Sequence, residues 1–201
     1  MDPQRPSRAA TAAYVIVTVL LTLILAGAVV EIVLAAVGSV RGGHAITIAR
    51  TVPPDQLGPL PPDVRAPGYV PVLQTIRNAS PSQLALRVAV DLAPLLLAVP
   101  GLWLLRTLLG SLRRGDPFSA ANVQRLRSLG FLFLLGSVVV SLLTHVLQEL
   151  LVQTTPPDDT LAGPDWAPIP VPGLLAGLGV LVLAELFAHG ARLREDVEGT
   201  I

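Results

Sequence analysis

Five ionisable side chains could do chemistry inside the apolar runs of this sequence, because they share one depth. Counted from the ends of their runs, Glu31, Asp91 and His145 each lie seven residues in, which is about 10 Å at 1.5 Å per helical residue. Arg87 and Glu149 lie one helical turn from Asp91 and His145. Ionisable groups within a membrane are expected to face the protein interior and to pair with one another.

Two kinds of chemistry fit this polar cluster. In a structural network, Arg87 bonds Asp91 or Glu31, and His145 bonds Glu149; we favour this interpretation because such positions near the boundary are less costly than the membrane centre. In a ligand site, His145 and Glu149 present two ligands on one helical face, and Glu31 or Asp91 would complete a zinc-like set. The positive charge of Arg87 opposes a metal ion. A proton sensor requires only His145 and one carboxylate.

A second charged position lies in the last apolar run. Glu185 is about one turn inside the end of this run, where an unpaired carboxylate is costly. Arg106, Arg125 and Arg127 are expected at similar depth. We therefore predict a structural clamp in which Glu185 contacts one of these arginines, in preference to a ligand or proton role for Glu185.

The composition decides which elements position these residues. The chain has 201 residues, of which 52% are hydrophobic and only 14% charged, and its mean hydropathy is +0.65. Soluble domains carry roughly 25% charged residues, so we expect an integral membrane protein. The net charge is zero, which gives no sign of direct nucleic-acid binding. With no cysteine in the chain, disulfides and thiolate metal sites are excluded.

Four apolar stretches are long enough to cross a bilayer core of about 30 Å as helices. The sequence predicts an all-α membrane protein, a single domain over residues 1–201 with four transmembrane helices in a bundle. Arginines precede the first stretch, as in a secretory signal, but its 26 residues exceed the roughly 7–15 of a signal's apolar core. We therefore expect an uncleaved first helix. The predicted helices span about residues 13–38, 84–109, 120–152 and 171–189.

The distribution of arginine predicts the orientation, because basic residues concentrate in cytoplasmic segments. With four helices, both termini lie on one side. Nine arginines fall on that side and four on the other, so both termini are predicted to be cytoplasmic in a bacterial plasma membrane. The nine are Arg5, Arg8, Arg106, Arg113, Arg114, Arg125, Arg127, Arg192 and Arg194, and the four are Arg41, Arg50, Arg65 and Arg77. Those beside the loop between the second and third helices are expected to meet anionic lipid.

The outer loop, residues 39–83, is predicted to form a small extracytoplasmic β-ribbon. Residues 45–49 and 70–76 read as short strands, and the proline-rich stretch between them does not favour regular structure. Within the second helix, Pro94 and Pro100 each remove a backbone hydrogen bond and are expected to kink it. In the fourth helix, Gly173 and Gly177 either allow close approach of another helix or are ordinary filler in a glycine-rich chain.

Two motifs carry a resemblance to a known family. The first is Gly115-x-Pro117-Phe118-Ser119-x-x-Asn122, followed by Leu126, Arg127 and Gly130. The second is Leu183-Ala184-Glu185-x-Phe187-x-x-Gly190-x-x-Leu193-x-x-Asp196-x-x-Gly199-Thr200-Ile201. Here the chain resembles a bacterial family of small four-helix membrane proteins, catalogued only as a domain of unknown function. The family's genes look paired with a small helix-turn-helix regulator, which implies a cytoplasmic transcriptional regulator as partner. The resemblance implies no catalytic residue.

These observations favour a non-enzymatic membrane protein that senses or scaffolds, acting with a cytoplasmic regulator. The alternative is a small proton or ion conductor, or a transporter subunit, that uses the polar cluster. An enzyme ranks third, because the sequence has no nucleophile elbow, HExxH motif or P-loop. No cofactor is expected. The partners expected are the lipid bilayer and the regulator, and the sequence leaves the oligomeric state open.

Overall fold

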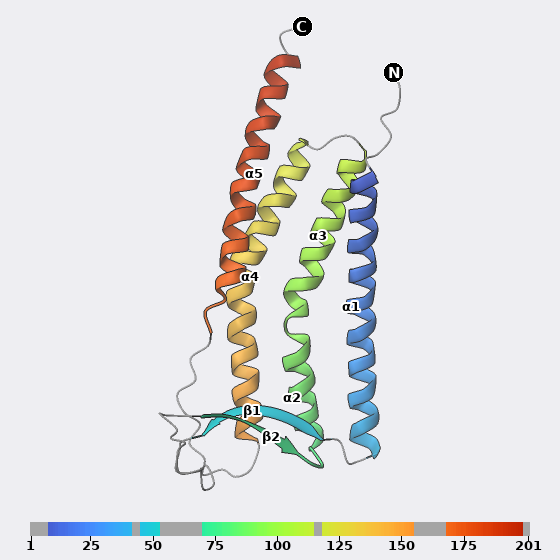
Figure 1. Cartoon of the computed structure of the whole chain (residues 1–201), viewed down its shortest axis with the longest axis vertical. Coiled ribbons are helices and arrows are strands. Elements are labelled where there is room, and N and C mark those ends of the chain that lie inside the picture. Colours follow the sequence, from blue (N-terminus) through green and yellow to red (C-terminus); the bar gives the residue numbers. More distant parts are fainter. Residues whose placement is uncertain (1–7, 42–44, 53–69, 115–117, 155–167, 199–201) are drawn as a thin grey trace, which may run out of the picture. The chain divides into compact units, whose positions relative to one another are not determined.

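The computed structural model describes residues 8–41, 45–52, 70–114, 118–154 and 168–198, and Figure 1 shows it as mostly helical. The helices are α1 (Arg8–Arg41), α2 (Pro81–Leu92), α3 (Leu95–Arg113), α4 (Ala120–Gln153) and α5 (Val171–Glu198). Within the described residues, four helical segments are long and apolar enough to cross a membrane, with α2 and α3 together forming one of them. A small two-stranded antiparallel sheet accompanies them. The predicted fold class is confirmed.

The chain divides into two compact units, which are described separately below. The first unit consists of Met1–Ala28, Pro94–Ser141 and Ile169–Ile201, and the second of Val29–Ala93 and Leu142–Pro168. The divisions fall within α1, between α2 and α3, and within α4. Each unit therefore contains parts of several spanning helices.

The surfaces of the spanning helices are those of a protein that meets lipid. In α1, the side chains of Leu23, Val29 and Leu34 are more than half exposed, and no stripe of polar residues runs along the helix. Leu135 of α4 and Leu186 of α5 are similarly exposed. Aliphatic surface of this extent would be unfavourable in water, but a bilayer core accepts it.

The two prolines of the second span behave differently. The span breaks at Ala93 and Pro94, between α2 and α3, because Pro94 has no N–H to donate to the carbonyl of Val90. Both residues nevertheless keep right-handed helical dihedrals, and the Pro94 carbonyl already accepts the N–H of Ala98 at an N–O distance of 3.1 Å. Pro100 lies inside α3, so only Pro94 separates two helices.

The predicted β-ribbon is present as β1 (Ile46–Val52) and β2 (Val70–Ile76). The strands pair antiparallel, with Ile46 opposite Ile76. Alternation along β1 buries Ile46 and Ile48 and exposes Thr47. The two buried isoleucines form the core of the second unit with Leu84 and Leu151. The ribbon thus packs on α2 and α4 through one apolar face.

The start of α2 is fixed by a reciprocal cap. After β2, Asn78 takes a positive φ of 62°, which asparagine tolerates better than most residues. Ser80 then caps the helix: its hydroxyl accepts the N–H of Gln83, and the side chain of Gln83 accepts the N–H of Ser80. Gln83 also donates Nε2–H to the carbonyl of Thr154 at 2.7 Å. This side chain therefore ties the start of α2 to the end of α4.

Helix α4 begins at Ala120, the start that the sequence predicts. The carbonyl of Ser119 accepts the N–H groups of Asn122 and Val123, at N–O distances of 2.9 and 3.2 Å. Residues 115–117, where a turn with Gly115 and Pro117 is expected, lie outside the described residues. So do most of the proline-rich stretch and the Gly199-Thr200-Ile201 end of the second motif.

Candidate functional site

Three of the five residues of the polar cluster meet in the second unit. On α2, Arg87 and Asp91 form an ion pair with an Nε–Oδ2 distance of 2.7 Å, and both side chains are partly exposed. Arg87 also donates through Nη1 to the backbone carbonyl of Thr47 on β1, at 3.2 Å. The Glu31 side chain of α1 lies close enough to Asp91 and Arg87 to interact electrostatically with both. The guanidinium of Arg87 therefore interacts with two carboxyl groups and with the backbone of β1.

We call Glu31 and Asp91 the acid pair. When both carboxyl groups are ionised, their negative charge exceeds the positive charge of Arg87. Two ionised carboxylates would place two negative charges beside the single positive charge of Arg87. Taking up one proton would balance the charge of Arg87. The arrangement of Glu31, Asp91 and Arg87 can therefore bind a proton without leaving an unpaired charge. These three residues connect α1 and α2 with strand β1.

The other two members of the cluster lie elsewhere in the second unit. His145 and Glu149 are partly buried on α4, and the carboxylate of Glu149 accepts Nε2–H of Gln153 at 3.2 Å. In the described part of the chain, neither residue forms a hydrogen bond or ion pair with Glu31, Arg87 or Asp91. Nor does that part contain three His, Cys, Asp or Glu residues grouped closely enough for a metal ion. The zinc-like set is therefore not assembled.

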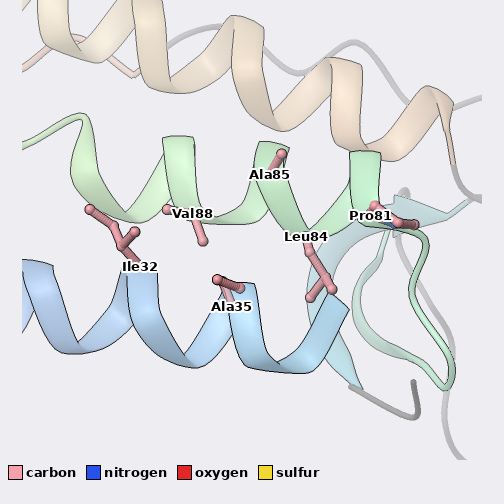
Figure 2. A pocket seen from close by; sticks show the side chains of 7 residues that line it. Ile32, Ala35, Pro81, Leu84, Ala85 and Val88 are labelled. Atoms are coloured by element: carbon pink, nitrogen blue, oxygen red, sulfur yellow. The ribbon is translucent and has the colours of Figure 1, made fainter. Parts of the chain in front are cut away.

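An apolar groove runs between α1 and α2 next to the acid pair. Figure 2 shows Ile32 and Ala35 of α1 facing Leu84 and Val88 of α2 across it. Glu31 and Arg87 directly precede two of these residues in the chain. The lining offers no charged side chain; the full set is Ile32, Ala35, Ala36, Pro81, Leu84, Ala85 and Val88. The facing surfaces of α1 and α2 along the groove are therefore apolar, and the ionisable groups lie beside the groove rather than in its lining.

In the first unit, Glu185 contacts one of the three arginines expected around it. Arg127 donates through Nη2 and Nε to Oε1 of Glu185, at 2.9 and 3.1 Å. The side chains are 38% and 65% exposed, respectively, so the pair lies at the surface of the unit. Arg106 donates instead to Thr18, and Arg125 to Asn122. The clamp therefore joins α4 and α5 through Arg127.

The two sequence motifs pack against each other in the first unit. The ring of Phe118 lies 5.3 Å from that of Phe187, centroid to centroid. A Cβ added at Gly190 would lie 3.2 Å from the Phe118 ring, so glycine makes room for it. Together with the pair of Arg127 and Glu185, these contacts hold the start of α4 against α5.

Asn122 of the first motif is the most deeply buried polar side chain of the described residues. It is 0% exposed, and its Oδ1 accepts two hydrogen bonds. The hydroxyl of Ser111 on α3 donates at 2.7 Å, and Nη1 of Arg125 donates at 2.8 Å. A buried amide costs free energy unless it is bonded, and here it joins the end of α3 to the start of α4.

The comparison with protein families matches residues 55–201, which include both motifs and well over half of the chain. This chain belongs to the family described as "Protein of unknown function (DUF2975)". No curated protein and no solved structure gave a significant match. The resemblance predicted from the motifs is thus confirmed at the level of the family, and the chain is a multi-pass membrane protein within it.

The small-residue face of α5 lies within the matched region and is used for close packing. A Cβ at Gly173 would clash with Ser137 of α4, and one at Gly177 would lie 2.6 Å from the backbone nitrogen of Leu134. One at Gly130 of α4 would lie 2.6 Å from the Leu181 side chain. A Cβ added at Gly179, by contrast, would have nothing within 4 Å of it. The spacing of Gly173 and Gly177 therefore reflects helix contact rather than filler.

Sequence reasoning missed several partners. The Ser80-x-x-Gln83 capping box was visible as a pattern, whereas the bond from Gln83 to the Thr154 carbonyl left no signal. The Thr47 carbonyl is backbone, so no residue type points to it. Tyr14, which lies under Arg106 and Arg113, was visible only as an aromatic residue near the end of a span.

Proposed function

We propose that this chain is a non-enzymatic sensor of the bacterial plasma membrane, with both termini in the cytoplasm, that signals to a cytoplasmic helix-turn-helix regulator. The observation that carries the proposal is the acid pair of Glu31 and Asp91 around Arg87, because Arg87 also holds the ribbon backbone at Thr47. A change of charge on α1 or α2 is thereby linked to β1, which is not part of the spanning helices. The regulator rests on the family resemblance.

The proposed signal is the uptake of a proton by the acid pair. The ionisable groups of the second unit that bear on it are Glu31 from α1, Arg87 and Asp91 from α2, and His145 and Glu149 from α4. Uptake of a proton lowers the negative charge of the acid pair and so weakens its attraction for Arg87, and the guanidinium is then free to change its bond to the Thr47 carbonyl. Acidification should therefore loosen β1. The strand would then be held in place by the packing of Ile46 and Ile48.

Hydrogen exchange in proteoliposomes tests this signal. The protection of the β1 amides, corrected for the intrinsic pH dependence of exchange, should decrease as the pH falls, and Asp91→Asn should remove that dependence while the four spans stay protected. Glu149→Gln is the matched control and should retain the response. If His145→Gln abolishes the response and Asp91→Asn does not, the imidazole titrates and the acid pair is not the sensor.

The orientation is tested with single cysteines, since the chain has none of its own. Arg77 and Arg192 are both exposed and fall on opposite sides of the predicted topology. In intact cells, a membrane-impermeant maleimide should label Arg77→Cys and leave Arg192→Cys unlabelled. The opposite pattern would place both termini outside.

A second candidate, a small proton or ion conductor, rests on the same acid pair, because neighbouring carboxyl groups in spanning helices also suit proton transfer. Proton flux in proteoliposomes distinguishes the two. A sensor should give no flux above that of empty liposomes. Flux that Glu31→Gln abolishes would favour the conductor.

A further inference from the structure

Four arginines near the ends of α3 and α4 in the first unit differ in what they contact. Arg125 is bonded to Asn122, and Arg127 is paired with Glu185. Arg106 and Arg113 form no ion pair with a carboxylate of the described residues. They lie seven residues apart on α3, or about two turns, and so share one face of the helix. The cations of this face therefore lack internal counter-charges.

Both of these guanidinium groups lie against a single aromatic ring. Arg106 is 5.3 Å and Arg113 is 4.9 Å from the centroid of Tyr14 on α1, measured from Cζ. Arg106 donates Nε–H to the hydroxyl of Thr18, at 3.2 Å. The Nε of Arg113 is buried and has no hydrogen-bond partner among the described residues. The ring thus holds two positive charges in place while leaving most of their donors unused.

A third arginine and the Tyr14 ring both lie beside Gly110. A Cβ at Gly110 would lie 3.8 Å from Cε2 of Tyr14 and 3.8 Å from Nη1 of Arg114. Arg114 is exposed and likewise forms no ion pair with a described carboxylate. Gly110 therefore has Tyr14 on one side and Arg114 on the other, which brings a third positive charge to this end of α3.

We propose that Tyr14, Arg106, Arg113 and Arg114 form a binding site for the phosphate headgroup of an anionic phospholipid. Unpaired arginine within a membrane span is costly and calls for a counter-ion, and guanidinium binds phosphate through parallel N–H donors. Both α1 and α3 belong to membrane spans, and tyrosine is typical of the headgroup level. A lipid can therefore reach the site from the bilayer, with its acyl chains along the aliphatic surface of α1.

The site is tested by lipid titration of the full chain in detergent, followed by native mass spectrometry and thermal unfolding. Phosphatidylglycerol should bind and raise the melting temperature, whereas phosphatidylcholine and inorganic phosphate should not. Arg106→Gln and Arg113→Gln should each weaken phosphatidylglycerol binding about tenfold, the effect of losing one charge-assisted contact of about 1.4 kcal/mol. Arg192→Gln, which removes an exposed arginine from α5, is the matched control and should bind as the unchanged chain does.

Tyr14→Leu keeps all the charges and serves where Arg106→Gln does not fold. It should weaken phosphatidylglycerol binding by releasing the guanidinium groups, and Tyr14→Phe, which keeps the ring, should bind normally. Equal losses in Arg113→Gln and Arg192→Gln would overturn the site, because binding would then follow surface charge alone. Equal stabilisation by inorganic phosphate would overturn the lipid as its ligand.

Discussion

In the first unit, α4 and α5 meet at glycines, where a single added carbon would touch backbone. In the second unit, the ribbon, α2 and the end of α4 are joined by polar side chains that bond to backbone carbonyls and to one another. Close helix contact depends on the absence of side chains, whereas the polar joints depend on particular donors and acceptors. The first arrangement leaves no room for an added carbon at the contact, and the second includes the carboxyl groups that we propose take up a proton. Substitutions should therefore act differently in the two units.

The largest effect is expected at the helix contact of the first unit. Gly177→Ala should lower the free energy of unfolding by about 3 kcal/mol, because overpacking against the Leu134 backbone forces α5 away from α4. Gly179→Ala, two residues along the same helix, should instead raise it by about 0.5–1 kcal/mol, since alanine is the better helix former and the space is open. Unfolding in detergent measures both. Shifts of the same sign would show that the close contact is not formed.

The second largest effect is expected at the buried hydrogen bonds of Asn122, which lie in the same unit as the glycine contacts but do not depend on them. Asn122→Ala should cost about 2 kcal/mol, because it removes a fully buried amide: Nη1 of Arg125 loses this acceptor, and the Ser111 hydroxyl keeps only the Leu108 carbonyl. Gln124→Ala, at an exposed position two residues later, should change the free energy of unfolding little. Thermal unfolding of the two variants checks this, and a cost confined to Gln124 would contradict it.

A smaller effect is expected in the second unit. Gln83→Leu keeps the volume but removes the bond from the Ser80 N–H to the Gln83 side chain and the bond to the Thr154 carbonyl, and should cost about 1–2 kcal/mol. Hydrogen exchange should rise in the first turn of α2 and leave α5 unchanged. Gln148→Leu, at an exposed position of α4, is the control. Faster exchange in α5 of the Gln83 variant would mean that the units do not respond separately.

The smallest effect concerns the pair of Glu185 and Arg127. Loss of one partner from a buried pair can cost about 3–5 kcal/mol, but Glu185 is largely exposed, and exposed pairs contribute about 0–1 kcal/mol. A double-mutant cycle of Glu185→Gln and Arg127→Gln should therefore give a coupling energy below about 1 kcal/mol. A coupling of several kcal/mol would show that the pair is desolvated in the bilayer.

The sequence was most informative where apolar length decides the structure. The four spans, the ribbon strands and the starts of α4 and α5 all follow from apolar runs, proline and capping residues. Depth within a span was a weaker guide to the site. It grouped Glu31, Arg87 and Asp91, which are in contact, but also His145 and Glu149, for which the structure shows no contact with those three.

The reason is rotation about the helix axis. Each residue turns a helix by about 100°, so two side chains at equal depth face each other only if the packing of their helices sets the angle. Apolar runs without a polar stripe, such as α1, do not encode that angle. For the same reason the sequence named three arginines that could reach Glu185 without selecting Arg127, and it gave no partner for Arg106 or Arg125, because their contacts with Tyr14, Thr18 and Asn122 depend on which faces meet.

The alternation of the ribbon has a mechanical consequence. Ile46 and Ile48 fill the core of the second unit, while the hydroxyls of Thr47 and Thr75 lie 3.3 Å apart on the other face. A shift of one residue would turn threonine into the core and isoleucine out of it. The strands therefore cannot slide past each other in small steps. A displacement of the ribbon is therefore expected to move the two paired strands together, because the ribbon is held to α2 both by the apolar face of Ile46 and Ile48 and by the bond from Arg87 to the Thr47 carbonyl.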